Sequence, residues 1–486
     1  MVDNSAPSGL TELVKNSVAP APNRGVNTRH GLRETRMKKR HIVGAVALAA
    51  GLALGLAACA PGGSTAADAS SRPVSKDVSG KDVTLKILDF WQNDEGKWMD
   101  SVVAEFEKQH PNITIKRTTQ DWGQVNNTVG LRLADPNGPD IALVNNGWSA
   151  MGTLAKGGRI LNLDAYSKLY GWDKEFPDTI ARQTEFTPDG KEMGTGSLFA
   201  TPAARSSLIG LYYNKTILDR LGLPVPKTLA DFEKDAAAVK AAGQVPIAYG
   251  SQDKGSSTSI LFALQNLYAA ADKIGDFVYS SGDVPITDTG IVQAATDVKK
   301  WADDGWFTPN YAGIQYADAQ NEFLSGKAAF RFEYTGSLAF SEAQNQEFGY
   351  VQLPQVEGGK VVGTGASAAN LAISSKSKNP DAAAAFLDFM AGKASAQAAV
   401  DHGFLPLLHS GLDIPSGNGE LATEIAAQQS LDKSNGYTPY FDWSTPTMLD
   451  TIGGQLQQLY AGQVTPKQLA EAGQKDYDAF QAQRKG

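Results

Sequence analysis

The chain has little of what a catalytic or metal-binding site usually needs. Its 486 residues contain one cysteine, Cys59, and five histidines. A single cysteine excludes an internal disulfide framework and a cysteine-based zinc site. The motifs His-Glu-x-x-His and Gly-x-Ser-x-Gly do not occur, and no Gly-Lys pair completes a Walker A phosphate loop. We therefore expect no cofactor and no metal.

The cysteine ends a segment that has the layout of a secretory signal. Residues 37–41 are basic, residues 42–58 form an uncharged run of Ala, Leu, Val and Gly, and Cys59 follows. The run is slightly short for a membrane-spanning helix, which needs about 20 apolar residues. Leu56-Ala57-Ala58-Cys59 resembles the lipobox of bacterial lipoproteins, which implies cleavage before Cys59 and a lipid on its side chain. An uncleaved anchor helix is the alternative.

The sequence around this signal is low in large apolar residues. Residues 1–36 are polar and without periodicity, and we interpret them as a mis-assigned N-terminal extension, with the true start at Met37. Residues 59–80, rich in Gly, Ser, Ala and Asp, are predicted to be a flexible tether. We expect a protein anchored by lipid on the extracellular face of the cell membrane.

The part that follows the signal is acidic and long. Residues 1–58 hold eight Lys and Arg and three Asp and Glu, so their removal leaves 36 basic and 49 acidic residues and a formal charge of −13 instead of −8. This charge argues against nucleic acid and anionic lipid as direct partners. The 428 residues that remain exceed what one core usually serves, which predicts two lobes.

Two stretches of the chain show alternating strand and helix patterns. The first runs from a strand at Val83–Leu88 through a helix around Trp98 to short strands at Asn112–Lys116 and Asp140–Val144. The second starts with a strand at Leu208–Tyr213 and a helix that Thr228 caps, followed by a strand at Val245–Tyr249, and long helices close the chain. This order predicts α/β lobes with ligands beyond the carboxyl ends of the strands.

Five motifs then appear in a fixed order. They are Gly138–Ile141, Tyr212–Lys215 with Leu221–Thr228 and Phe232, Phe323–Phe330 with Gly336-Ser337, Asn379–Leu387, and Gly462–Pro466. Together they resemble the extracytoplasmic solute-binding proteins of ATP-binding-cassette importers, in the carbohydrate-binding group that includes maltose-binding protein. Two positions depart from the family pattern: Leu229 and Leu338 stand where tryptophan is common. The second puts one sugar-stacking position in doubt.

The resemblance implies an α/β fold of two lobes that close like a hinge around a ligand. We expect crossovers near Ala200–Arg205 and Gly359–Gly365 and a return around Gly392. The expected boundaries are 81–200 and 362–395 for lobe one, and 205–357 and 400–486 for lobe two. The implied partners are a carbohydrate and the permease subunits of an importer, and we expect a monomer.

Sugar sites combine flat aromatic rings with fixed polar groups. Four tryptophans stand beside polar residues at predicted strand ends or loops: Trp91, Trp122, Trp148 and Trp443. We predict that they contact the ligand, although each has a core or interface role as its alternative. Trp98 fits a helical apolar stripe and is predicted to be core.

Polar candidates follow the predicted strands of both lobes. They are Asn93, Asp94 and Asn145 in lobe one, Asp253, Glu333 and Tyr334 in lobe two, and Arg205 at the first crossover. Each is otherwise a solvated loop residue, and Arg205 could instead pair with a carboxylate across the hinge.

Two other functions stay open. A cationic solute such as a polyamine would want a carboxylate-lined cleft with aromatic rings, which the same residues supply. A glycoside hydrolase needs only two carboxylates about 5 to 9.5 Å apart, which a sequence does not reveal. We expect a binding protein and no enzyme, because the family motifs account for most of the chain.

Overall fold

The computed structural model describes residues 73–485, except 177, 188, 255, 339, 342–343, 354–358, 368, 408–410, 415 and 417–418. The chain divides into two units, Met1–Gly63 and Ser64–Gly486, and all described residues belong to the second. The predicted extension, the signal and Cys59 lie outside the described residues. None of the helices in the described part is long and apolar enough to span a membrane.

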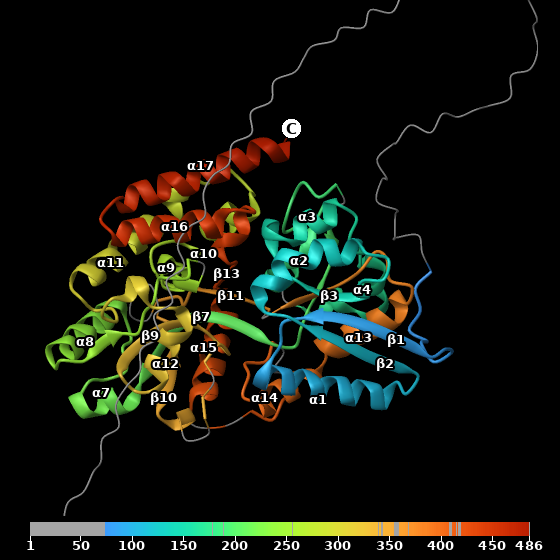
Figure 1. The fold of residues 1–486 in the computed structure, drawn as a ribbon, viewed down its shortest axis with the longest axis horizontal. Coiled ribbons are helices and arrows are strands. Elements are labelled where there is room, and N and C mark those ends of the chain that lie inside the picture. Colours follow the sequence, from blue (N-terminus) through green and yellow to red (C-terminus); the bar gives the residue numbers. More distant parts are fainter. Residues whose placement is uncertain are drawn as a thin grey trace, which may run out of the picture. The chain divides into compact units, whose positions relative to one another are not determined.

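Lobe one is built on a five-stranded sheet of order β2-β1-β3-β12-β6 (Figure 1). Its strands are β1 (Val83–Asp89), β2 (Ile113–Thr119), β3 (Ile141–Val144), β6 (Thr201–Pro202) and β12 (Asn370–Ile373). β1 pairs in parallel with β2 and β3, as the strand–helix–strand order predicted. β12 is antiparallel to both β3 and β6, because the chain returns to this sheet from the other lobe.

Helices cover both faces of this sheet. They are α1 (Asn93–Gln109), α2 (Trp122–Ala134), α3 (Met151–Lys156), α4 (Asp164–Tyr170), α5 (Trp172–Glu175), α6 (Asp178–Ala181), α13 (Pro380–Ala391) and α14 (Lys393–Asp401). In α1 the buried residues Trp98, Val102 and Phe106 recur every four positions, which places them on one side of the helix. In Figure 1, α2 lies above the sheet and α1 below it. A two-stranded sheet of β4 (Glu185–Phe186) and β5 (Ser197–Leu198) follows α6.

Lobe two has a sheet of order β13-β11-β7-β9-β8, with β10 also paired to β7. Its strands are β7 (Ser206–Asn214), β8 (Val245–Ile247), β9 (Ala328–Tyr334), β10 (Phe348–Val351), β11 (Gly363–Ser367) and β13 (Tyr437–Thr438). Its helices are α7 (Lys215–Leu221), α8 (Leu229–Ala241), α9 (Ser259–Gln265), α10 (Ala271–Tyr279), α11 (Ile291–Asp303), α12 (Tyr316–Leu324), α15 (Glu420–Ser434), α16 (Met448–Tyr460) and α17 (Pro466–Lys485). Thr228 caps α8 as predicted, since its hydroxyl accepts a 3.1 Å hydrogen bond from the Asp231 amide.

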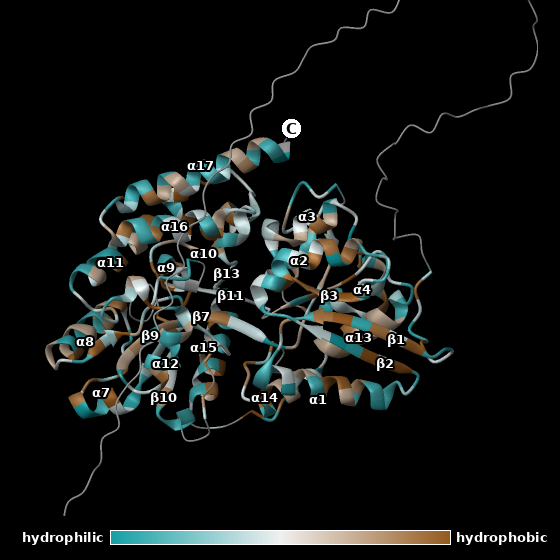
Figure 2. Cartoon of the chain, in the orientation of Figure 1, coloured by the Kyte–Doolittle hydropathy of each residue, from teal (hydrophilic) through white to brown (hydrophobic). Residues whose placement is uncertain are grey.

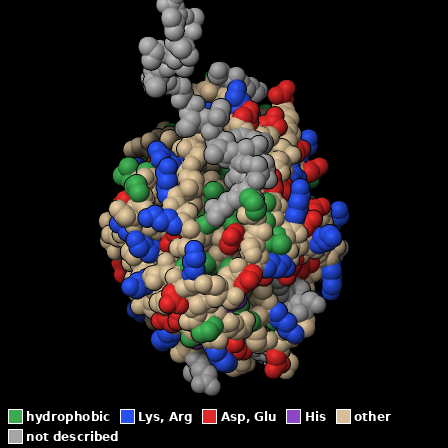
Figure 3. Space-filling model, turned by 90° about the vertical axis from the view of Figure 1, so that its right-hand side faces the viewer, with side chains coloured by type: hydrophobic (Ala, Val, Ile, Leu, Met, Phe, Trp, Pro, Cys, Tyr) green, Lys and Arg blue, Asp and Glu red, His purple; other side chains and the backbone are tan. Residues whose placement is uncertain are grey.

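Apolar residues are concentrated in the sheets, and the helices carry both apolar and polar residues. Figure 2 shows brown, hydrophobic residues along β1 and β2 and more teal, hydrophilic residues on the helices around them. Figure 3 shows the face that lobe one forms, where basic and acidic side chains are interspersed.

The chain passes between the two sheets where β6 ends and β7 begins, within the range Ala200–Arg205 that was predicted for the first crossover. The crossover predicted at Gly359–Gly365 is wrong. β11 still pairs with β7, Gly365 opposite Leu208, so lobe one resumes only at β12. Gly365 allows β11 to lie close to β7, because a Cβ on it would lie 2.6 Å from the Leu208 Cδ2 atom.

The return to lobe two is also later than the predicted Gly392. α14 (Lys393–Asp401) still belongs to lobe one, where the Trp98 indole N–H donates a 3.4 Å hydrogen bond to the Ser395 carbonyl. On its way back to lobe two, the chain lies beside the first crossover at Leu405. The Leu405 carbonyl accepts a 2.9 Å hydrogen bond from the Ser206 amide.

The end of the predicted tether is packed on lobe one. Val74 and Val78 pack against the core, and the Asn112 side chain donates to the Val78 carbonyl at 2.6 Å. The Lys76 ammonium lies 4.8 Å from the centre of the Tyr170 ring. Residues 74–78, at the end of the predicted tether, thus lie against lobe one.

Candidate functional site

A cavity of about 470 Å³ lies between the lobes and receives side chains from both. Lobe one contributes Phe90, Glu95, Trp122, Asn145, Asn146 and Asn370, and lobe two contributes Ser207, Tyr316, Tyr334, Ser337, Tyr440, Asp442 and Trp443. A second hollow of about 740 Å³ adjoins it, since both are lined by Phe90, Glu95 and Tyr316. Arg205, on the crossover, lines the first cavity.

Aromatic rings form much of the cavity wall. Trp122 begins α2 and is 40% exposed, and it packs edge-on against Phe90 with ring centres 5.2 Å apart. On the lobe-two side, Tyr334 at the end of β9 stacks with Tyr440, 5.9 Å away at 19°. Trp443 lies 5.0 Å from Tyr440. Flat apolar faces thus reach the cavity from both lobes.

Two asparagines of lobe one line the cavity and carry unpaired amide atoms. Asn146 follows β3 and Asn370 begins β12, and each is 2% exposed. The Asn370 amide donates to the Asn146 side-chain oxygen. This leaves the Asn146 Nδ2 donor and the Asn370 Oδ1 acceptor buried without a partner. Unpaired buried polar groups cost free energy, so a ligand that bonds both is favoured.

Arg205 is held by three contacts. Its guanidinium donates a 2.8 Å hydrogen bond to Glu95 of α1, and it lies 3.8 Å from the centre of the Phe404 ring and 5.0 Å from that of Trp98. The residue is 2% exposed, and its Nε atom has no partner. The structure therefore shows the predicted alternative, in which Arg205 pairs with a carboxylate. The Nε donor of this cavity-lining residue remains without a partner.

Asp442 is the remaining charged residue of the lining. It lies in the short 3₁₀ helix η8 (Phe441–Ser444), and in the part of the chain that the structure describes no Lys or Arg forms an ion pair with it. Burial raises the pKa of Asp442 to about 6, with only its own backbone N–H opposing the shift.

The lobes touch each other beside Trp443. Gly147, in the 3₁₀ helix η2 (Gly147–Ser149) of lobe one, lies so close that a Cβ there would be 2.3 Å from the Trp443 Cβ. Further along, Trp148 packs on Phe480 of α17, with ring centres 5.3 Å apart.

Five of the predicted site residues meet at the cavity: Trp122, Asn145, Arg205, Tyr334 and Trp443. Asn93 and Asp94 line the adjoining hollow, where Asp94 pairs with Lys97 at 2.7 Å. Whether any of them binds a ligand stays a prediction.

Two of the predicted tryptophans are buried away from the cavity. Trp91 is 1% exposed and packs edge-on against Trp98, with ring centres 5.1 Å apart. Trp98 is fully buried, as predicted. Trp148 is 4% exposed and lies between Phe186 and Phe480. The structure gives both candidates the core or interface position that was their alternative.

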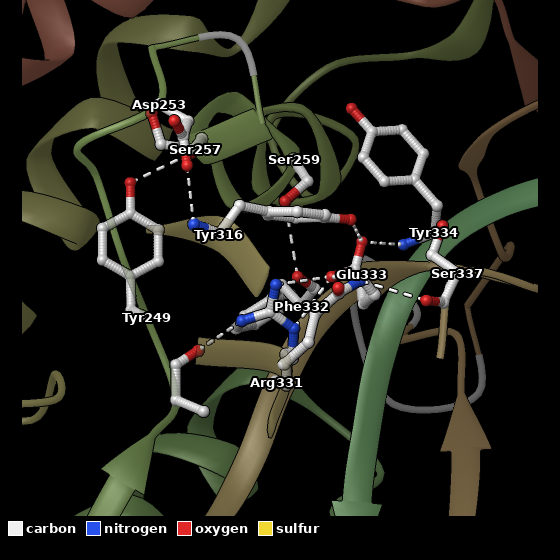
Figure 4. Close-up of polar contacts among 12 residues, drawn as sticks. Tyr249, Asp253, Ser257, Ser259, Tyr316, Arg331, Phe332, Glu333, Tyr334 and Ser337 are labelled. Atoms are coloured by element: carbon white, nitrogen blue, oxygen red, sulfur yellow. Dashed lines mark hydrogen bonds and ion pairs between the residues drawn. The ribbon is translucent and has the colours of Figure 1, made fainter. Parts of the chain in front are cut away.

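Two predicted carboxylates of lobe two bind neighbouring protein groups (Figure 4). Glu333 is fully buried, binds the Arg331 guanidinium at 2.6 Å, and accepts hydrogen bonds from the Tyr316 hydroxyl and, at 2.8 Å, from the Tyr334 amide. Asp253 accepts a 2.7 Å hydrogen bond from the Tyr316 amide at the start of α12. Neither lines the cavity, but together they hold Tyr316 and Tyr334, which do.

Sequence reasoning missed Phe90, Asn146, Tyr316, Asn370, Tyr440 and Asp442. Three of them, Phe90, Asn146 and Asp442, directly follow or precede the predicted Trp91, Asn145 and Trp443. Only at Trp91 does the neighbour line the cavity in place of the predicted residue. Asn370 carried no signal, because its place depends on the late crossover.

In the described part of the chain, no cluster of three or more His, Cys, Asp or Glu residues could hold a metal ion.

Comparison with known proteins assigns this architecture. Residues 91–397 match the family described as bacterial extracellular solute-binding protein. The chain belongs to this family. The two-lobed α/β fold and the family resemblance predicted from the motifs are thereby confirmed.

Two relatives that are named for sugars match more than half of this solute-binding protein. The maltodextrin-binding protein MdxE of Bacillus subtilis (strain 168) is 25% identical over 415 residues, 83% of this chain and 87% of that protein. The multiple sugar-binding protein of Streptococcus mutans is 24% identical over 299 residues, 60% of this chain and 67% of that protein.

Solved structures support the fold. A chitin oligosaccharide binding protein superposes with a TM-score of 0.67 at 21% identity, covering 82% of this chain and 99% of that one. The GacH receptor of Streptomyces glaucescens, which was solved without ligand and with acarbose, gives 0.65 at 20% identity, covering 82% and 98%.

Proposed function

We propose that this solute-binding protein captures a mono- or oligosaccharide outside the cell and delivers it to the membrane subunits of an ATP-binding-cassette importer. The unpaired Asn146 and Asn370 amides beside aromatic walls carry the proposal. A sugar hydroxyl is both a donor and an acceptor, so one hydroxyl satisfies the free donor and the free acceptor together. The aromatic faces of Trp122 and Tyr440 suit the apolar C–H faces of a sugar ring.

Capture works by bridging the lobes. A ligand that contacts Trp122 and Asn146 of lobe one and Tyr334 and Trp443 of lobe two stabilises the closed arrangement over an open one. The closed protein then presents both lobes to the permease. The relatives named for maltodextrin, multiple sugars and galactooligosaccharides support a carbohydrate as the ligand.

The protein is proposed to bind its ligand without converting it. Of the carboxylates that line the cavity, Glu95 is committed to Arg205, so it is poorly placed to act as a general acid or nucleophile. We also propose that the protein is a monomer, and that Cys59 carries a lipid that holds it on the extracellular face of the membrane. The signal-like residues 37–58 support the anchor.

Calorimetry with a ligand panel tests the binding function. The panel contains glucose, galactose, maltotriose, a galactooligosaccharide, amino acids and spermidine, and each mixture is checked for products after incubation. Saturable heat with a saccharide and no product supports the proposal. Heat with spermidine or an amino acid but no saccharide contradicts it, and hydrolysis products would favour an enzyme.

Lipidation is tested in cells. Wild-type chain should incorporate labelled palmitate and sediment with membranes, whereas Cys59→Ser should do neither. A Cys59→Ser protein that still carries label contradicts the anchor.

A further inference from the structure

We infer that the captured saccharide carries a protonated amino group, which the Asp442 carboxylate holds among the rings of Tyr334, Tyr440 and Trp443. The inference rests on the proposed function and names the ligand class of the same cavity. Three charged residues line that cavity in the described chain, namely Glu95, Arg205 and Asp442. The first two neutralise each other at 2.8 Å, so the charge of Asp442 is left over.

The surroundings of Asp442 are unfavourable for an isolated negative charge. Its chain neighbours Phe441 and Trp443 are buried, and Tyr440 stacks on Tyr334 beside it. The Asp442 charge contributes to raising the pKa of both phenols, behind the larger effect of their own burial. No cation among the described residues contributes to the pKa of Asp442 itself. Asp442 is half-buried and has no cation beside it, so pairing with a positive group stabilises its charge.

An ammonium group supplies the missing partner in two ways. It forms charge-assisted hydrogen bonds with the carboxylate, which are about twice as strong as neutral ones. The electron-rich faces of Tyr and Trp rings also attract cations. A neutral hydroxyl bonds to the carboxylate but leaves its charge uncompensated, so the site favours an amino sugar over the parent sugar.

The rest of the cavity favours a saccharide over a simple polyamine. The free Asn146 donor and Asn370 acceptor match a hydroxyl, which a polyamine lacks. Trp122 provides a flat apolar face on the opposite lobe. One ligand that uses all these groups needs hydroxyls, an apolar ring face and one amino group.

The test compares matched saccharides by calorimetry on the full-length chain. The probes are glucosamine, N-acetylglucosamine and glucose, their β-1,4-linked trimers, maltotriose, and spermidine. We expect the free-amine member of a matched set to bind at least about tenfold more tightly than its acetylated and neutral counterparts. We expect Asp442→Asn, which is neutral and of the same size, to remove that preference.

Outcomes separate this inference from the proposed function. Neutral sugars that bind as tightly as the amino sugars, or a preference that persists in Asp442→Asn, overturn the inference and leave sugar capture intact. Binding of spermidine but of no saccharide overturns both. Binding of the amino sugars alone, lost in Asp442→Asn, supports both.

A measurement on the wild-type chain covers the case in which Asp442→Asn does not fold. The affinity ratio of glucosamine to glucose should fall by at least about threefold from pH 7 to pH 5, because the Asp442 carboxylate becomes protonated. The groups that face Asp442 are Tyr334, Tyr440 and the Glu95–Arg205 pair. Because they affect the binding of both sugars, the affinity ratio reports on Asp442. A ratio that does not change over this range overturns the inference.

Discussion

The Arg205 guanidinium and the Glu95 carboxylate form a 2.8 Å ion pair that joins the first crossover to helix α1 at the cavity wall. The Arg205 side chain is 3% exposed and that of Glu95 28%. We expect Glu95→Gln to lower the free energy of unfolding by about 1–3 kcal/mol, since it leaves a buried cation without its counter-charge. Urea denaturation measures the effect. Asp94→Asn is the control, because its pair with Lys97 is exposed and worth about 0–1 kcal/mol; equal losses in the two variants would contradict this role.

Trp122 is the aromatic wall residue most open to a ligand. We expect Trp122→Ala to weaken saccharide binding about tenfold, because a stacked ring contributes on the order of 1 kcal/mol and its burial adds more. Stability should change little, since the ring is 40% exposed. Calorimetry and thermal unfolding check the two effects. A variant that binds like the wild type would remove Trp122 from the site.

Trp91 should show the opposite behaviour. Its ring is 1% exposed and packs on Trp98, so Trp91→Ala leaves a large cavity in the core of lobe one. We expect a loss of about 3–5 kcal/mol in the free energy of unfolding. At a temperature where the variant is folded, its affinity for the saccharide should stay within about threefold of wild type. A variant that is as stable as wild type but no longer binds the saccharide would show that Trp91 contacts the ligand.

These two tryptophans show how far the sequence could be interpreted. The strand and helix patterns of both lobes and the first crossover were predictable, because periodicity and caps are local properties. Trp91 and Trp122 look alike in sequence, since both stand beside polar residues near a strand end. Which of them faces the cavity depends on how the chain turns after β1, and non-local packing decides that. The pairing of Asn146 with Asn370 depends on β12 returning antiparallel to β3, which no local pattern signals.

Glu424 should make the stability of lobe two depend on pH. It is buried in α15, where it contacts the Tyr212 hydroxyl, and burial together with the nearby Glu420 raises its pKa well above the ordinary value. A raised pKa means that the folded state binds the proton more tightly than the unfolded state. The stabilisation is therefore complete at low pH and is lost as pH rises through the folded-state pKa.

We therefore expect Glu424→Gln to unfold at a higher temperature than wild type at pH 8. At pH 5 the difference between the two melting temperatures should be smaller. Thermal unfolding across that range is the measurement. Glu471→Gln is the matched control, because Glu471 is exposed in an ion pair with Lys467. If Glu424→Gln and Glu471→Gln differed from wild type by the same amount at pH 5 and at pH 8, Glu424 would have no such role.

Gly147 allows the close contact between the lobes beside Trp443. Its φ of +69° disfavours other residues, and a Cβ would lie 2.3 Å from the Trp443 Cβ, closer than atoms can approach. We expect Gly147→Ala to push η2 and η8 apart, which moves Asn146 and Trp443 and weakens saccharide binding by at least about tenfold. Calorimetry measures the affinity, and small-angle scattering should show a larger radius of gyration with ligand than the liganded wild type has. Gly130→Ala on α2 is the control, because its nearest neighbour, a Leu154 methyl group, would lie at an ordinary 3.7 Å. If Gly147→Ala bound ligand and compacted like Gly130→Ala, the contact would have no part in closure.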